Sequence, residues 1–203
     1  GLEGIALIQS ELEADNWPVR TFVIGGTDAL SKAQFIALAA APHTFLNANH
    51  NPLPRIAEHE WINCGIIWAK SADGTVERWL QPKLFPAWPE QNVTYQGMFQ
   101  GDSIFTFKGA FDDNTQYHFS SVVCFDWIGK SNNRPAWRWV LDDLQQQVNP
   151  NQMSLSWFFV IQCNRKPSHP SFLTEVGSFF DQTTVPNVRR DRTCLVFANS
   201  AGR

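Results

Sequence analysis

Apolar residues recur along the chain in two different periods, and the longer of the two predicts helices. Helical spacing predicts four helices, in residues 2–14, 31–41, 135–147 and 169–181. Pro18 lies just beyond the first of them, where a proline helps to end a helix. Ser31 opens the second as a candidate N-cap, and Pro135 stands at the start of the third, a position that proline favours.

Shorter apolar runs between these segments predict strands. They lie in residues 20–25, 61–70, 76–80, 103–108, 117–125, 153–162 and 192–199. We expect Gly25-Gly26 to turn the chain after the first strand, and Asp73-Gly74 to join the second and third as a hairpin. Residues 43–54 and 82–89 are rich in turn and breaker residues and are predicted to be loops. Strands that alternate with helices indicate an α/β or layered α+β fold with buried sheets.

Composition bounds the class of protein. The 203 residues are 43% apolar and 17% charged, with nine Trp and sixteen Phe, which is enough to bury a core and argues against disorder. A net charge of −3 lacks the basic excess of a nucleic-acid-binding protein. No apolar stretch is long enough to cross a bilayer, and the chain does not open on a signal segment. We therefore expect a cytoplasmic protein with neither nucleic-acid nor membrane partners.

The four cysteines carry no metal or redox signature. Cys64, Cys124, Cys163 and Cys194 are widely spaced, so no CxxC pair exists, and each stands in an apolar run. Buried, reduced thiols in a cytosolic protein are the expectation from these observations.

Cys124 is the first candidate for chemistry, because it ends a predicted strand that leads into a turn. A thiol held at such a point is rigid, and the backbone N–H groups of the turn can face a developing oxyanion. The same apolar run also suits a cysteine that only fills the core. Lys83 stands between Pro82 and Leu84, which restrains it for an electrostatic role. Glu90, seven positions later, either pairs with this lysine or lies on the surface.

Taken in order, several stretches resemble the nitrilase superfamily of carbon–nitrogen hydrolases. Residues 63–86 contain an Asn-led strand, an Asp-Gly hairpin and a lysine loop with Leu and Pro, and a glutamate follows. Residues 123–126 read Val-Cys-Phe-Asp, similar to the cysteine elbow of that family. Residues 192–202 resemble its late strand ending in Asn-x-x-Gly, and residues 22–26 resemble the strand before the Asn-led one.

The resemblance implies a four-layer α-β-β-α sandwich with a Glu–Lys–Cys site. Cys124 would be the nucleophile that forms a thioester, and Lys83 would stabilise the oxyanion. Glu90 would support the lysine or position the attacking amine or water. The substrate would be a small amide, a nitrile or a carbamoyl compound, no cofactor or metal would be needed, and the protein would form homo-oligomers. Residues 162–167 lie where the family places substrate-pocket residues, so Cys163 either lines the pocket or fills space.

Two departures from the family pattern leave a second interpretation open. Lys83 directly precedes Leu84, so an alignment on residues 84–86 moves the lysine position to Gln81. The general-base glutamate normally ends an early strand after a proline, whereas the candidate here, Glu3, begins the first predicted helix. The base is therefore Glu3, or it precedes residue 1, or it has been lost. If it has been lost, the chain is an inactive nitrilase-like module for binding or assembly in a larger protein. A third interpretation, an unrelated α/β protein that matches the family motifs by chance, also stays open.

The domain organisation follows from the same comparison. The resemblance implies that residues 1–203 are a single, partial carbon–nitrogen hydrolase-like domain, and we expect it to be truncated at both ends and to carry an insertion-like loop at about 31–61. His43, His50 and His59 are scattered through this loop without the spacing of a metal site, so a substrate-shaping or partner-contacting role fits it better. The cluster of Arg189, Arg190 and Arg192 is expected to be a solvated patch.

Overall fold

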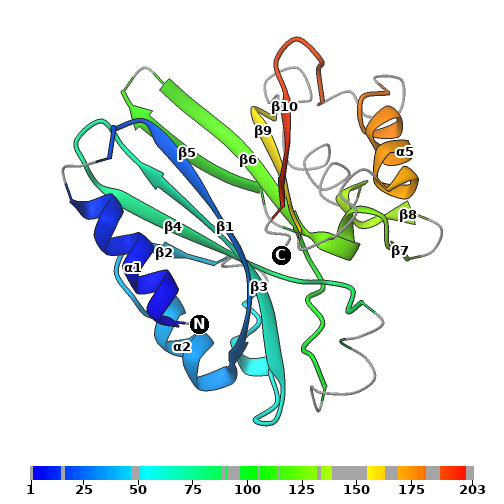
Figure 1. Ribbon diagram of the computed structural model, residues 1–203, viewed down its shortest axis with the longest axis horizontal. Coiled ribbons are helices and arrows are strands. Elements are labelled where there is room, and N and C mark those ends of the chain that lie inside the picture. The colour runs from blue at the N-terminus through cyan, green and yellow to red at the C-terminus, as the bar shows by residue number, and fades with distance from the viewer. Residues whose placement is uncertain are drawn as a thin grey trace.

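The structure is a computed structural model with a mixed α/β fold built on two four-stranded sheets (Figure 1). It describes residues 2–14, 17–46, 51–87, 90, 97–104, 106–113, 115–131, 134–138, 155–162, 169–181 and 188–199.

The first sheet has the strand order β1-β3-β4-β2 and is antiparallel except at its β2 edge. Its strands are β1 (Thr21–Ser31), β2 (Thr44–Phe45), β3 (Trp61–Lys70) and β4 (Val76–Pro82). The predicted hairpin between β3 and β4 is confirmed. Gly74 has a φ of +88°, which favours glycine, and Asp73 Oδ1 accepts a hydrogen bond from the backbone N–H of Thr75 at 2.9 Å.

The predicted turn at Gly25-Gly26 is wrong, because β1 runs through both glycines. The pairing of β1 with β3 instead shifts its register between Gly25 and Thr27, which is a bulge. A Cβ on Gly25 would lie 2.5 Å from Cζ3 of Trp68, so the site needs a glycine for close packing against the neighbouring strand.

The second sheet has the order β10-β9-β6-β5, with β6, β9 and β10 parallel to one another and β5 antiparallel to β6. Its strands are β5 (Thr106–Asp112), β6 (Thr115–Val123), β9 (Trp157–Gln162) and β10 (Cys194–Asn199). β5 lies a few residues later than predicted, and β6 ends before the predicted residue 125. The strands β7 (Lys130–Ser131) and β8 (Arg134–Pro135) form a separate small ribbon.

Three of the predicted helices are confirmed as α1 (Leu2–Glu13), α2 (Lys32–Ala39) and α5 (Pro170–Phe179). Ser31 caps α2 as predicted: its Oγ accepts from the N–H of Gln34, and the Gln34 side chain accepts from the N–H of Ser31 at 2.9 Å. The predicted helix 135–147 lies mostly outside the described residues. Its first residue, Pro135, belongs to β8, and residues 136–138 are helical.

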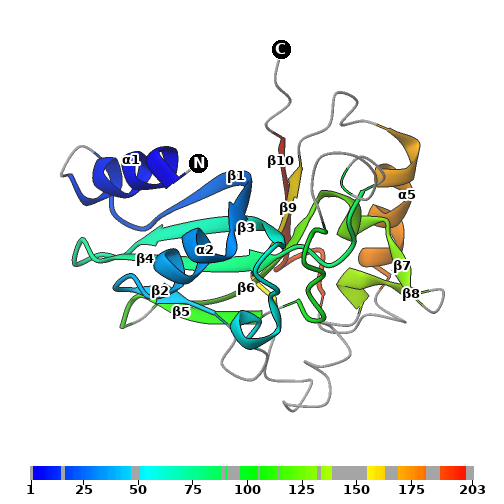
Figure 2. The ribbon, with the colours of Figure 1, turned by 90° about the horizontal axis from the view of Figure 1, so that it is seen from below.

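Three hydrophobic clusters hold these elements together. The cluster between the sheets joins Ile67 and Trp79 to Phe119 and Phe159. A second cluster lies on the other side of the first sheet, where α1 and α2 cover it, as Figure 2 shows. A third lies on the outer side of the second sheet and includes the α5 residues Phe172 and Phe179 with Trp127.

The segment predicted as an insertion-like loop contains regular structure. It holds α2, the short strand β2 and a 3₁₀ turn, Leu53–Arg55. The prediction of a plain loop over 43–54 is therefore wrong at β2, which extends the first sheet because Thr44 and Phe45 pair with Arg78 and Trp79 of β4. Phe45 also stacks on Trp79, with ring centroids 5.7 Å apart.

The cysteines differ in exposure. Cys64 is buried in β3, as expected, whereas Cys124 is partly exposed and Cys194 is exposed. The expectation of burial is wrong for Cys194 because it begins β10, which is the edge strand of the second sheet. Cys163 lies outside the described residues. Within the described part of the chain, no helix is long and apolar enough to span a membrane.

Candidate active site

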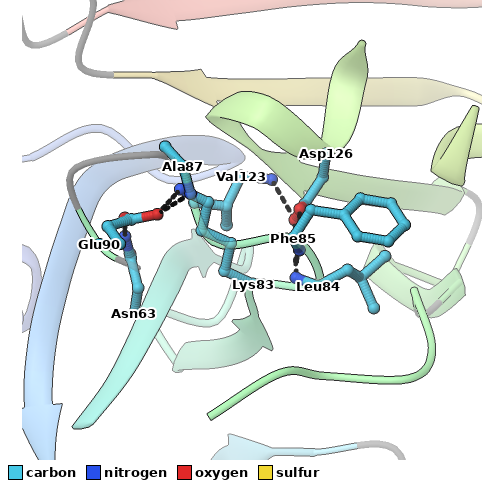
Figure 3. Close-up of polar contacts among 8 residues, drawn as sticks. All are labelled: Asn63, Lys83, Leu84, Phe85, Ala87, Glu90, Val123 and Asp126. Carbon is cyan, nitrogen blue, oxygen red and sulfur yellow. Dashed lines mark hydrogen bonds and ion pairs between the residues drawn. The ribbon is translucent and has the colours of Figure 1, made fainter. Parts of the chain in front are cut away.

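Lys83 directly follows β4, and its side chain is only 2% exposed. Its backbone is held on both sides: the N–H donates to the carbonyl of Asn63 in β3, and the carbonyl accepts from the N–H of Gly101, each at 2.8 Å. The ammonium Nζ lies 2.5 Å from Oε2 of Glu90 (Figure 3). Of the two alternatives for Glu90, pairing with the lysine is the one that the structure contains.

Within the described residues, the carboxylate of Glu90 accepts hydrogen bonds from three donors. Asn63 Nδ2 donates to Oε1 at 2.7 Å, while Lys83 and the backbone N–H of Ala87 donate to Oε2 (Figure 3). Both oxygens are therefore engaged in orienting the lysine. The other side-chain atom of Asn63, Oδ1, is buried and has no hydrogen-bond partner among the residues that the structure describes.

Cys124 begins the 3₁₀ turn Cys124–Trp127, directly after the last residue of β6. The prediction that it ends the strand is thus corrected by one residue. Its φ of +49° lies in the left-handed region, which costs a non-glycine residue about 1 kcal/mol or more and recurs at functional sites. Cys124 is partly exposed rather than fully packed in a core.

The turn of Cys124 lies at the carboxyl ends of three parallel strands. Val123 pairs with Ile161 at the end of β9, and Gln162 pairs with Asn199 at the end of β10. Ligands of α/β sheets bind at such ends, because strand-to-helix turns expose backbone N–H groups there. The side chain of Gln162 is 1% exposed, and neither its Oε1 nor its Nε2 has a partner among the described residues.

Asp126 connects the lysine segment to the cysteine turn, and sequence reasoning missed this role. Its buried carboxylate accepts from the N–H of Phe85 at 2.8 Å, of Leu84 at 3.1 Å and of Val123 at 3.3 Å (Figure 3). Burial raises the pKa of Asp126 to about 7, although these N–H groups and the charge of Lys83 act in the opposite direction. An acid inside the apolar run of residues 122–128 was the available signal.

The alternative lysine position, Gln81, has a different role. It is buried at the end of β4, and its Nε2 donates to the carbonyls of Pro82 at 2.8 Å and Ser103 at 3.1 Å. These contacts fix the chain before the lysine segment. Lys83 is therefore the residue of this segment that brings a cation to the site.

Glu3 lies apart from this network in the first turn of α1, where it is exposed. Within the described residues, no hydrogen bond or ion pair joins Glu3 to Lys83, Glu90 or Cys124. The structure thus brings Lys83 and Glu90 into contact and ties their segment to Cys124 through Asp126, while Glu3 stands on the helix that covers the first sheet.

Among the described residues, one hollow lies at the carboxyl ends of β9 and β10, the sheet edge that also carries the Cys124 turn, and another lies away from that edge. A cavity of about 110 Å³ lies between β1 and the ends of β9 and β10, and its lining includes Ile161 and Asn199. It is smaller than a typical small-molecule site of 300 Å³ or more. A larger hollow of about 540 Å³ lies at the opposite ends of the strands, between the β3–β4 and β5–β6 hairpins, and contains Asp73 and Asp113.

Among the described residues, no group of three or more His, Cys, Asp or Glu side chains could hold a metal ion. The basic cluster near β10 is exposed as expected, and Arg189 pairs there with Asp191 at 3.0 Å. No protein-family model matches the chain, and no curated protein matches it either. The interpretation of this site therefore depends on its own residues, Lys83, Glu90, Cys124 and Asp126.

Proposed function

We propose that the protein is a thiol hydrolase of the nitrilase type, acting on the non-peptide carbon–nitrogen bond of a small amide, nitrile or carbamoyl compound. One observation carries the proposal: an ion pair between buried Lys83 and partly buried Glu90 is tied through Asp126 to the turn that bears Cys124. This arrangement supplies a fixed cation next to a segment with a strained, partly exposed thiol.

The layering of the fold supports the family resemblance. One hydrophobic cluster lies between the two sheets, and the other two lie between a sheet and helices. We propose that these layers form the four-layer α-β-β-α sandwich of carbon–nitrogen hydrolases. Face-to-face pairing of such sandwiches into a homodimer is part of the same proposal, and sedimentation equilibrium of the purified chain tests it.

In the proposed reaction with an amide, Cys124 attacks the carbonyl carbon as a thiolate. The Sγ–C bond forms and the carbonyl electron pair moves to oxygen. That pair then returns to re-form the carbonyl, and the C–N bond breaks as the nitrogen takes up from solvent the proton that the thiol gave up and leaves as an amine. Water attacks the resulting thioester, the C–Sγ bond breaks, and a carboxylic acid and the thiol are formed. An amine in place of water would give acyl transfer instead.

Lys83 has two roles in this reaction. A positive charge close to the thiol favours the thiolate, and the same ammonium stabilises the oxyanion of the tetrahedral intermediate. Glu90 keeps the ammonium oriented, because its carboxylate is itself fixed by Asn63 and Ala87. These donors occupy both oxygens of Glu90, which suits a supporting role better than that of general base.

The inactive-module interpretation is the second candidate, and the position of Glu3 favours it. The carboxylate of Glu3 is exposed in the first turn of α1, and among the described residues it has no hydrogen-bond or ion-pair partner that would tune a general base. If no other carboxylate serves, the Lys83–Glu90–Asp126 network would remain as a structural element of a binding domain.

Ammonia release from benzamide, benzonitrile and N-carbamoylglycine distinguishes the two candidates. The enzyme interpretation predicts turnover of at least one compound, loss of that turnover in Cys124→Ala and Lys83→Met, and retention in Cys194→Ala. It also predicts that iodoacetamide modifies Cys124 faster than the more exposed Cys194 at neutral pH. If Cys124 reacts no faster than Cys194 and no compound is turned over, the module interpretation stands.

A further inference from the structure

Asp126 lies two residues after Cys124 but makes its shortest hydrogen bond to a residue 41 positions away in the chain. Oδ1 accepts from the N–H of Phe85 at 2.8 Å, and Oδ2 accepts from the N–H of Leu84 at 3.1 Å. These two amides directly follow Lys83. The same Oδ2 accepts from the N–H of Val123, the last residue of β6, at 3.3 Å. Figure 3 shows the carboxylate between the two segments.

We propose that Asp126 is a positioning residue: its carboxylate holds the backbone that carries Lys83 against the turn that carries Cys124, and thereby makes the thiol reactive. The inference rests on the proposed function in assigning the nucleophile to Cys124. It goes further by placing the origin of the thiol's reactivity in a residue that touches neither substrate nor reacting atoms.

The chemistry of the side chain suits this role. A carboxylate offers two acceptor oxygens, so it can receive three backbone N–H groups at once, whereas an amide offers one oxygen and an NH₂ that cannot accept. Asp126 is completely buried, and buried N–H groups need acceptors. Removing the carboxylate would free the N–H groups of Leu84 and Phe85, and the segment would lose its hold on the cysteine turn.

The sign of the effect separates positioning from simple electrostatics. The positive charge of Lys83 acts on Asp126, and Glu90 pairs with the same lysine at 2.5 Å. A negative charge beside a thiol raises the thiol pKa, so a purely electrostatic Asp126 would make Cys124 less reactive, and its removal would lower the pKa of Cys124. If Asp126 positions Lys83, its removal withdraws the cation and the pKa of Cys124 rises.

The first experiment follows the rate of iodoacetamide modification of Cys124 against pH, by peptide mass spectrometry on the intact chain. Exposed Cys194 is the reference thiol in the same molecule. The inflection of the rate–pH profile of Cys124 marks the pKa of its thiol. In Asp126→Asn we expect this inflection to move up by about one pH unit, with about tenfold slower modification at neutral pH. Val122→Ala, a buried change in β6 just before the turn, is the control for lost stability and is expected to keep the wild-type inflection. An unchanged or lowered inflection in folded Asp126→Asn overturns the proposal.

A second pair of variants tests the hydrogen bond without altering Asp126, should Asp126→Asn fail to fold. Phe85→Pro removes the N–H that donates at 2.8 Å, whereas Phe85→Ala removes the ring and keeps that N–H. Positioning predicts that the proline variant raises the inflection of Cys124 relative to the alanine variant. Equal inflections in the two variants contradict it.

The wild-type protein distinguishes failure of this inference from failure of the proposed function. If wild-type Cys124 titrates and reacts like Cys194, the thiol is not activated and both proposals fail. If wild-type Cys124 is more reactive and the Asp126 and Phe85 variants leave it so, the proposed function survives and the positioning role alone is wrong.

Discussion

The ammonium of Lys83 lies 2.5 Å from Oε2 of Glu90, with 2% of the lysine side chain and 16% of the glutamate side chain exposed. Both partners of such a pair lose hydration, so the net contribution of the pair to stability is small. Removing one partner is costly, because the other charge is then left unpaired in the same place. The pair therefore keeps a cation inside the protein but adds little to the stability of the fold.

Replacement of Glu90 by Gln is expected to lower the free energy of unfolding by about 3 kcal/mol, because it leaves the Lys83 ammonium buried without a counter-charge. Urea denaturation at neutral pH measures this loss. The double variant Lys83→Met with Glu90→Gln removes both charges, and we expect it to be more stable than Glu90→Gln alone. Independent, additive effects of the two changes would show that Lys83 and Glu90 are not coupled as an ion pair in solution.

The left-handed backbone at Cys124 gives a second prediction. With a φ of +49°, alanine at this position keeps the strain of a Cβ, whereas glycine relieves it. We expect Cys124→Gly to be more stable than Cys124→Ala by about 1 kcal/mol, in contrast to the usual cost of glycine. Thermal unfolding of the two variants side by side provides the comparison. Alanine as the more stable variant would mean that φ is negative in solution.

Local signals predicted much of the fold. The cap at Ser31, the Asp73-Gly74 turn and the apolar run of β3 each act over a few neighbouring residues, so the sequence pattern contains them. The predicted turn at Gly25-Gly26 is a bulge instead, because a pair of glycines is typical of both structures and the local sequence does not separate them. The deciding contact is with Trp68, on the neighbouring strand, and no local pattern shows it.

The sequence likewise predicted the main residues of the site but not the contacts that connect them. The order of Lys83, Glu90 and Cys124 came from the resemblance, and the short spacing of the first two allowed an ion pair. The role of Asp126 depends on hydrogen bonds to residues about 40 positions away, and the backbone angle of Cys124 depends on how β6 meets its turn. Both are consequences of tertiary packing, which spacing alone does not encode.

Asp126 is expected to make stability depend on pH. Burial raises its pKa to about 7 in the folded protein, well above the value near 3.8 of a solvated aspartate. The folded state therefore holds this proton more tightly than the unfolded state. The resulting stabilisation is complete below about pH 4 and is lost as the pH rises through about 7, by up to about 4 kcal/mol.

Urea denaturation of the wild type and of Asp126→Asn between pH 4 and pH 8 isolates this contribution. Asparagine does not titrate, so the stability of the variant relative to the wild type should improve as the pH rises from 4 to about 7 and then level off, whatever the offset between them at pH 4. Parallel stability curves for the two proteins would show that Asp126 does not titrate in this range.

The close packing of Gly25 on Trp68 gives the last prediction. A Cβ at residue 25 would lie 2.5 Å from Cζ3 and 3.0 Å from Cη2 of the Trp68 ring, and 3.2 Å from the carbonyl oxygen of Ile66. Because a buried indole and a strand backbone cannot easily move aside, we expect Gly25→Ala to destabilise the protein by about 2 kcal/mol.

Gly177→Ala is the matched control. Gly177 lies on α5, and apart from its own helix backbone no described residue comes within 4 Å of the added methyl group, so the same change should stabilise the protein by about 0.5–1 kcal/mol. Opposite shifts of the melting temperature in the two variants would support the packing of β1 on β3, and equal shifts would contradict it.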